Sequence, residues 1–254
     1  MILTIDIGNT NIVIGCFQGE SLLFQERFST NPNATSLEYA TIFKVTFALH
    51  HIEASGIRGG IISSVVPSVT DTVKAAAEKY TGAEILVVGP GIRTGLKLAV
   101  DNPAQLGSDL VVGAVAGIHK FPVPQILIDM GTATTVSVVD RQKVFIGKII
   151  MPGLGISLDA LTSRTAQLPK VSLDPPKKLI AANTVDSIKS GILYGTAGAL
   201  DGLIDRINEE MGEACTVVAT GGLMGTIAPL CRNQMVLEDD LLLQGLRIIY
   251  HKNR

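Results

Sequence analysis

The chain has 254 residues, of which 46% are hydrophobic, 17% are charged and 4% are aromatic, and its net charge is −2. This length and apolar content allow either one large α/β domain or two small ones with buried cores. The balanced charge and the few aromatic side chains argue against nucleic acid as a partner.

The three cysteines, Cys16, Cys215 and Cys231, are widely spaced and form no CxxC pattern. Neither a disulfide framework nor a zinc site is therefore expected, and small apolar side chains in a reducing compartment are the simplest interpretation. Apolar stretches are broken by Gly, Asp or Pro well short of a membrane span, and no basic segment precedes the first one. We expect a cytoplasmic protein with no signal peptide and no membrane contact.

In chain order, the first half is predicted to open with three consecutive strands and then to alternate helices with strands. The expected strands are 2–6, 11–17, 22–28, 59–66 and 85–88. The expected helices are 36–52, 68–81 and 107–120. Residues 89–103 are rich in Gly and Pro and predict an irregular loop, the kind of segment that often carries function.

The second half repeats this order of elements. The expected strands are 125–129, 134–140, 143–150 and 216–219. Helices are expected from 153 to about 164, from an Asn183-Thr184 cap to about 211, and after the last strand. Because no low-complexity linker is present, we expect two packed halves, 1–120 and 121–254.

One phrase occurs twice, as Ile5-Asp6-Ile7-Gly8-Asn9-Thr10 and as Ile128-Asp129-Met130-Gly131-Thr132-Ala133, with the two Asp residues 123 positions apart. This spacing, close to half the chain, predicts a duplicated domain with one carboxylate per half facing a shared cleft. A strand, an acid and a glycine turn allow backbone N–H groups to approach phosphate oxygens while the acid holds a cation. The repeat therefore predicts a nucleoside triphosphate site.

Competing sites lack their motifs. The chain has no GxxxxGK[ST] and no GxGxxG after a strand, and its four histidines accompany no nucleophile elbow. A single Asp-x-Gly after a strand would usually be an ordinary turn. Two copies, together with Thr220-Gly221-Gly222 after a late strand, favour a functional interpretation.

The segments Asp6–Asn11, Asp129–Thr135 and Ala219–Leu223 resemble the first phosphate loop, the second phosphate loop and the adenosine loop of the actin-like ATPase superfamily, which includes sugar kinases and heat-shock chaperones. Within it, further motifs are similar in order and spacing to type III pantothenate kinases: Ile62–Pro67, Thr94–Leu96, Asn102-Pro103, Gly107–Asp109, Pro152–Pro169 and Asn183–Gly191. The resemblance implies an actin-like (ribonuclease H-like) duplicated α/β fold, mixed sheets flanked by helices, and ATP in a central cleft. It implies ATP-dependent phosphorylation of pantothenate to 4'-phosphopantothenate, the first step of coenzyme A biosynthesis.

The resemblance also implies the ligands of Mg-ATP. Asp6 would organise Mg²⁺ and the triphosphate, Asp129 would bind a monovalent cation, K⁺ or ammonium, and the remaining nucleotide contacts would come from Gly8, Asn9, Thr10, Asn11, Gly131, Thr132, Gly221 and Gly222. A single carboxylate acting through metal or water suits a hard cation.

For the acceptor, the resemblance implies that Asp109 is the general base that takes the proton from the hydroxyl of pantothenate. Gly107, Ser108, Leu110, Thr184 and Val100 would line the pantothenate site. Simpler structural roles stay open: Asp109 and Thr184 could cap the helices that they begin, and Gly107 could be only a turn residue.

Three positions depart from the family pattern: Leu110 stands where the family has Arg, Val100 where it has Tyr, and Lys148 where it has Gly. An Arg at 110 could grip the pantothenate carboxylate with two charge-assisted hydrogen bonds, which Leu110 cannot make. A catalytically weak or inactive nucleotide-binding regulator of the same fold, or a kinase for a different small hydroxy acid, therefore stays open.

The resemblance implies a homodimer, with ATP and pantothenate as the small-molecule ligands. The apolar, glycine-dotted segment 183–211 is expected to pack against a second copy. The alternative is that the same glycines only pack the two halves of one chain.

Overall fold

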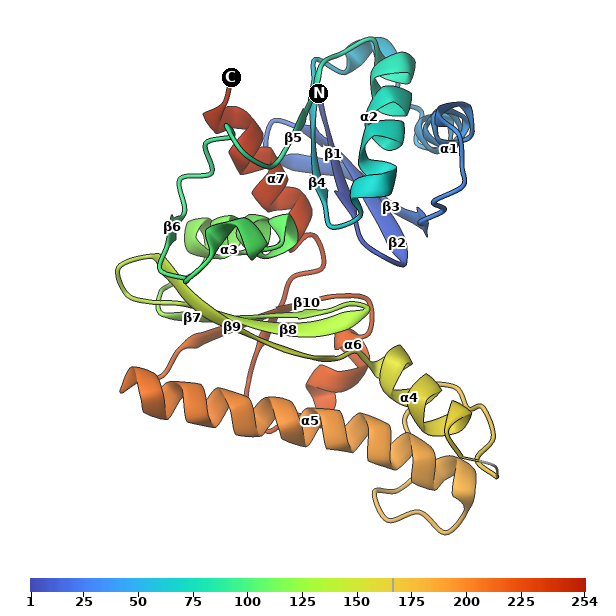
Figure 1. The fold of residues 1–254 in the computed structure, drawn as a ribbon, viewed down its shortest axis with the longest axis vertical. Helices are drawn as coiled ribbons and strands as arrows, with labels where there is room; N and C mark the ends of the chain where they lie inside the picture. The colour runs from blue at the N-terminus through green and yellow to red at the C-terminus, as the bar shows by residue number, and fades with distance from the viewer. Residues whose placement is uncertain (166) are drawn as a thin grey trace. The chain divides into compact units, whose positions relative to one another are not determined.

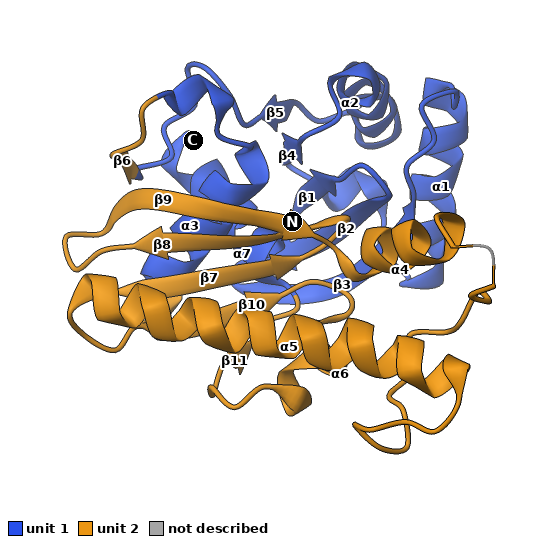
Figure 2. Cartoon of the chain, turned by 60° about the horizontal axis from the view of Figure 1, so that its bottom comes forward, with its two compact units in different colours: residues 1–96, 102–119, 240–254 blue, residues 97–101, 120–239 orange. Residues whose placement is uncertain are grey.

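The computed structural model describes residues 1–165 and 167–254. Ala166, inside the motif 152–169, lies outside the described residues. The chain divides into two units, coloured separately in Figure 2: unit 1 comprises Met1–Leu96, Asn102–His119 and Asp240–Arg254, and unit 2 comprises Lys97–Asp101 and Lys120–Asp239.

Unit 1 has a five-stranded sheet of order β3-β2-β1-β4-β5. Its strands are β1 (Ile2–Ile7), β2 (Asn11–Gln18), β3 (Ser21–Ser29), β4 (Gly60–Ser64) and β5 (Ile85–Val87). The first three strands pair antiparallel, while β4 is parallel to β1 and β5 is parallel to β4. Both parallel connections pass through helices, as parallel pairing requires.

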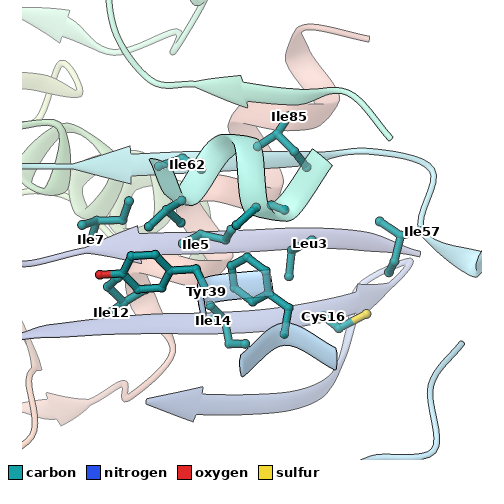
Figure 3. Close-up of a cluster of buried hydrophobic side chains, with 14 of the residues drawn as sticks. Leu3, Ile5, Ile7, Ile12, Ile14, Cys16, Tyr39, Ile57, Ile62 and Ile85 are labelled. Atoms are coloured by element: carbon teal, nitrogen blue, oxygen red, sulfur yellow. The ribbon is translucent and has the colours of Figure 1, made fainter. Parts of the chain in front are cut away.

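The helices of unit 1 are α1 (Ser36–Leu49), α2 (Pro67–Thr81), α3 (Ser108–Lys120) and α7 (Leu241–Lys252), with short 3₁₀ turns η1 (Ala54–Gly56) and η2 (Pro103–Gln105). A capping box of Thr35 and Glu38 begins α1, and Pro67 stands in the first turn of α2. The strand residues alternate between two cores. Leu3, Ile5 and Ile7 lie on one face of the sheet and pack with α1 and α2 (Figure 3). Residues on the opposite face, such as Ile2, pack with α3 and α7.

Unit 2 has a six-stranded sheet of order β11-β10-β7-β8-β9-β6. Its strands are β6 (Lys97–Leu98), β7 (Gln125–Met130), β8 (Ala133–Val139), β9 (Val144–Pro152), β10 (Thr216–Thr220) and β11 (Val236–Leu237). Its helices are α4 (Leu154–Ser163), α5 (Thr184–Met211) and α6 (Met224–Ile227), followed by the 3₁₀ turn η3 (Ala228–Leu230). The long α5 runs beneath the sheet in Figure 1 and buries Leu193, Leu200 and Ile204 against it.

The predicted duplication is confirmed by the topology. The order β9-β8-β7-β10-β11 repeats β3-β2-β1-β4-β5, with the same antiparallel and parallel pairs. Asp6 and Asp129 occupy equivalent positions, each the second-to-last residue of the central strand. The α/β fold of two mixed sheets flanked by helices is the one that the sequence predicts.

One detail differs from the sequence-based expectations. The irregular loop predicted for 89–103 contains β6, which pairs with β9 through only two residues and is too short to leave a sequence pattern. The last helix, α7, lies in unit 1, where Leu243, Leu246 and Ile249 pack in the same core as Ile2. The division of the sequence into duplicated halves at residue 120 stays a prediction.

Among residues 1–165 and 167–254, no helix combines the length and the apolar character needed to cross a membrane.

Candidate active site

The first predicted phosphate loop is a tight turn between β1 and β2. The Gly8 N–H donates to the Asn11 carbonyl at 2.9 Å, and the Thr30 hydroxyl donates to the Gly8 carbonyl at 2.7 Å. A Cβ on Gly8 would lie only 3.1 Å from the Asn11 carbonyl oxygen. With these carbonyls bonded inside the protein, Asn9 and Thr10 are left exposed at the tip of the turn.

Asp6 lies beside a hydroxyl on the neighbouring parallel strand. In the register of β1 and β4, Asp6 is opposite Ser63, and both belong to the sheet face on the side of α3 and α7. The side chain of Ser63 is buried, and its Oγ lies 3.0 Å from Oγ of Ser108 at the start of α3. Three segments that are distant in sequence therefore meet at the end of β1.

The hydroxyl of Ser108 makes a complete set of hydrogen bonds to the end of β4. It donates to the Ser64 carbonyl at 2.9 Å and accepts from the Ser64 N–H at 3.0 Å. Because its one proton is used on that carbonyl, the bond between Ser63 and Ser108 has Ser63 as the donor. Ser108, predicted as a substrate contact, thus has a hydroxyl committed to holding the first turn of α3 on β4.

Asp109 follows directly in the first turn of α3 and is half-buried. Its Oδ1 accepts the Leu110 N–H at 2.8 Å. A Cβ on Gly107 would lie 2.3 Å from the same oxygen, so the carboxylate lies over Gly107 in space that only glycine leaves open. Gly107 therefore leaves room for the Asp109 carboxylate in its observed position. By accepting the Leu110 N–H, Asp109 also satisfies a backbone donor in the first turn of α3.

In unit 2 the second predicted phosphate loop is also a glycine turn between two antiparallel strands, β7 and β8, and is one residue shorter than the first. The Gly131 N–H donates to the Ala133 carbonyl at 3.0 Å, and Gly153 donates to the Thr132 carbonyl at 3.2 Å. A Cβ on Gly153 would lie 2.4 Å from the Thr132 carbonyl oxygen, so the start of α4 presses on this turn. Asp129 is flanked in register by Thr135 on β8 and Thr220 on β10.

The predicted adenosine loop lies against the second phosphate loop. Gly221 has φ +106°, and a Cβ there would lie 2.4 Å from the Met130 carbonyl oxygen. Both the left-handed backbone and this close approach require glycine at 221. Gly222 is exposed just beyond it.

The remaining predicted residues are distributed between the units. Unit 1 contains Leu110, which is only 9% exposed and packs as a core side chain. Unit 2 contains Thr184, Val100 and Lys148. Thr184 is exposed in the first turn of α5, whose cap is Asn183, since the Asn183 side chain accepts the Asp186 N–H at 2.9 Å. Val100 is half-buried two residues after β6, and Lys148 is exposed on β9.

Sequence reasoning missed Ser63, Thr30 and Gly153 as parts of the site. Ser63 had the best available signal, since it lies in the motif Ile62–Pro67 at the end of a strand. Thr30 gave none, because its bond to Gly8 joins segments that are 22 residues apart.

The donor chemistry of these turns fits a magnesium-bound triphosphate. Asp6 offers a carboxylate, and the turn after it has Asn9 and Thr10 exposed. Mg²⁺ held largely through phosphates needs only one or two protein carboxylates. Within the described part of the chain, no group of three or more His, Cys, Asp or Glu side chains gathers to hold a metal by itself.

Comparison with known proteins gives a consistent result. Residues 2–206 match the family model described as type III pantothenate kinase. The chain is 44% identical over 254 residues to a type III pantothenate kinase of Geobacter sulfurreducens, with 100% of both chains covered. A second relative with this description, from Brevibacillus brevis, is 42% identical over the same length.

Among solved structures, the chain is similar to the inorganic polyphosphate/ATP-glucomannokinase of an Arthrobacter species, with a TM-score of 0.50, 14% identity and coverage of 100% and 99% of the two chains. It is also similar to a protein from Campylobacter jejuni described as a Baf family transcriptional activator, with a TM-score of 0.57, 15% identity and coverage of 99% and 97%. At these identities the likeness concerns the fold alone, which is the actin-like α/β fold that the sequence predicts.

Proposed function

The chain belongs to the type III pantothenate kinase family, and we propose that it transfers the γ-phosphoryl group of ATP to the 4'-hydroxyl of pantothenate, the first step of coenzyme A biosynthesis. The observation that carries this proposal is the full-length match to the family, with each of the three nucleotide loops folded as a tight glycine turn. ATP and a divalent metal follow from the kinase family.

We propose that Asp109 is the general base. Its carboxylate accepts the Leu110 N–H and lies over Gly107, which has no side chain to displace it. The helix that carries Asp109 is joined to β4 by the bond between Ser108 and Ser63, and Ser63 is opposite Asp6 in the sheet. In the proposed step, Asp109 accepts the proton of the pantothenate hydroxyl as that oxygen bonds to the γ-phosphorus. The bond from the γ-phosphorus to the β,γ-bridging oxygen breaks, and ADP leaves with that electron pair.

The phosphate turns have the complementary role in this proposal. Gly8, Asn9, Thr10 and Asn11 would position one side of the triphosphate, and Gly131 and Thr132 would contact the nucleotide from the second loop. Gly221 and Gly222 would allow the adenosine to lie against backbone. Bound Mg²⁺ supplies charge neutralisation on the phosphates, and Asp6 is the carboxylate proposed to hold it.

We propose that Asp129 binds the monovalent cation, K⁺ or ammonium. Its register neighbours Thr135 and Thr220 place hydroxyl-bearing residues on the two adjacent strands. Carboxylate and hydroxyl oxygens can coordinate K⁺, and they can equally accept hydrogen bonds from ammonium.

We also propose that the enzyme is a homodimer through α5. Gly191, Gly195 and Gly198 are exposed on one face of this helix, and a Cβ at any of them would meet nothing within 4 Å. Each glycine costs about 1 kcal/mol of helix propensity relative to alanine, a cost that packing inside this chain does not explain. Close approach by a second helix would explain it.

Since ATP is the phosphoryl donor, the cytoplasm stays the proposed location.

The test is an ADP-release assay of the purified protein with pantothenate and a panel of small hydroxy acids, with and without K⁺ or ammonium. Release that depends on pantothenate supports the proposal. ATP binding without release for any acceptor would favour a nucleotide-binding regulator, and release with another acid only would favour a different substrate.

A further inference from the structure

The end of α7 holds the loop Gly89–Leu96 by bonds to its backbone. The Asn253 Oδ1 accepts the Arg93 N–H at 2.9 Å, and the Asn253 Nδ2 donates to the Arg93 carbonyl at 3.0 Å. The same amide nitrogen donates to the Ile249 carbonyl of α7 at 2.8 Å. One side chain thus binds both backbone groups of Arg93 and ties them to the last turn of the helix.

Lys252 makes a second contact with this loop. Its Nζ donates to the Thr94 carbonyl at 3.2 Å. Gly95 has φ +76°, and a Cβ there would lie 2.3 Å from the same Nζ, so the lysine covers the glycine. Ile92 and Leu96 pack against the core that contains Ile249. The bonds to Arg93 and Thr94 therefore add to a packed loop rather than tether a loose one.

The loop held by Asn253 and Lys252 comes directly before residues 97–102, which include the predicted pantothenate contact Val100. Directly after Leu96, residues 97–98 form β6 on the sheet of unit 2, and Val100 and Asn102 follow. The backbone at 93–95 is thus held just before the segment that leads to the proposed pantothenate site. Fixing the start of such a short segment limits the conformations that its remaining residues can adopt.

We propose that Asn253 and Lys252 are positioning residues for the pantothenate-binding segment 97–102. The proposal rests on the proposed function, because the role of Val100 comes from the family resemblance. It assigns α7, which follows all the nucleotide loops in sequence, to recognition of the acceptor. Neither side chain is proposed to touch substrate.

The test compares three variants by steady-state kinetics. Asn253→Ala removes all three bonds, and the nearly isosteric Asn253→Asp removes the two donations at almost constant volume. Both are expected to raise the KM for pantothenate about 5- to 30-fold and to leave the KM for ATP and kcat within about 2-fold. Arg254→Ala is the matched control, since Arg254 pairs with Glu84 outside the loop, and its KM for pantothenate should stay unchanged.

Hydrogen exchange of the amides of residues 93–100 accompanies the kinetics and does not depend on activity. Faster exchange in Asn253→Ala, but not in Arg254→Ala, is expected. Unchanged exchange, or equal rises in the KM for ATP and pantothenate, would overturn the positioning role. If the unmodified protein does not phosphorylate pantothenate, the proposed function fails independently of the Asn253 variants. Faster exchange in Asn253→Ala would then show that Asn253 only stabilises the loop, and its role in acceptor recognition would be overturned.

Discussion

The hydroxyl of Ser63 donates to that of Ser108 across 3.0 Å, and this bond joins the strand beside Asp6 to the helix that carries Asp109. The strand that pairs with β1 beside Asp6 is thus joined by a hydrogen bond to the helix that carries Asp109, and these two carboxylates have the central proposed roles in unit 1. We expect this link to matter for both folding and turnover.

Ser108→Ala removes three hydrogen bonds and leaves the Ser64 N–H without its partner. We expect the free energy of unfolding to fall by about 1–3 kcal/mol. We expect kcat to fall about 10- to 100-fold, because the base is displaced relative to the phosphate turn. Urea unfolding and ADP release measure the two effects. Ser187→Ala, which removes a single exposed bond to Asn183, is the control and should change neither strongly.

Asp109→Asn keeps an oxygen that can accept the Leu110 N–H, so the start of α3 should stay folded. Loss of the base should lower kcat about 10²- to 10⁴-fold. The lower end is expected, since a loose phosphoryl-transfer transition state needs little base assistance. Calorimetric titration should give an unchanged ATP affinity. Turnover equal to that of the unmodified protein would remove Asp109 from the mechanism.

Leu110→Arg tests how the departure from the family pattern is accommodated. Leu110 is 9% exposed, so an arginine would bury a guanidinium or push the helix outward. We expect the free energy of unfolding to fall by about 2–5 kcal/mol, with no decrease in the KM for pantothenate. A stable variant with a lower KM would instead show that an arginine at 110 reaches the acceptor carboxylate, as the resemblance implies.

Gly195→Leu fills the open face of α5. Within one chain the new side chain meets nothing within 4 Å of its Cβ, so the fold should be retained or slightly stabilised. Dimerisation should be lost, which light scattering at micromolar concentration measures. Gly195→Ala should weaken the dimer less, because one methyl group allows closer approach of the helices. A dimer that persists in Gly195→Leu would exclude this face as the interface.

Asp201 predicts a pH dependence of stability. Burial by itself raises the pKa of its carboxyl, but hydrogen bonds from the Asn233 and Arg232 backbone N–H groups and from the Asn233 side chain outweigh it and leave the pKa lowered. Because the folded pKa lies below the unfolded one, the carboxylate stabilises the protein above the ordinary pKa of about 3.9. This contribution is lost as the pH falls through the folded value.

We expect Asp201→Asn to lower the free energy of unfolding by about 1.5–3 kcal/mol at pH 7. The difference from the unmodified protein should shrink between pH 5 and about 3, which urea unfolding at a series of pH values measures. A difference that stays constant over this range would contradict the assignment to the carboxylate charge.

Much of the fold is predictable because it depends on local patterns. Residues 2–6 and 125–129 are short apolar strands that end in an acid and a glycine, and the strands observed differ from these bounds by only one residue. The Asn183 cap and the 28-residue α5 also follow from local signals. The strands β6 and β11, of two residues each, do not, since their partners alone define them.

The sequence by itself determined the duplication, the glycine turns after β1 and β7, and the family, because each is carried by neighbouring residues whose backbone chemistry is local. Only the tertiary structure decided that the hydroxyl of Ser108 is committed to β4, that Leu110 is buried, and that Asn253 holds a loop 160 positions earlier. Each of these depends on hydrogen bonds or packing between segments far apart in the chain, and no local pattern encodes which distant group will be the partner.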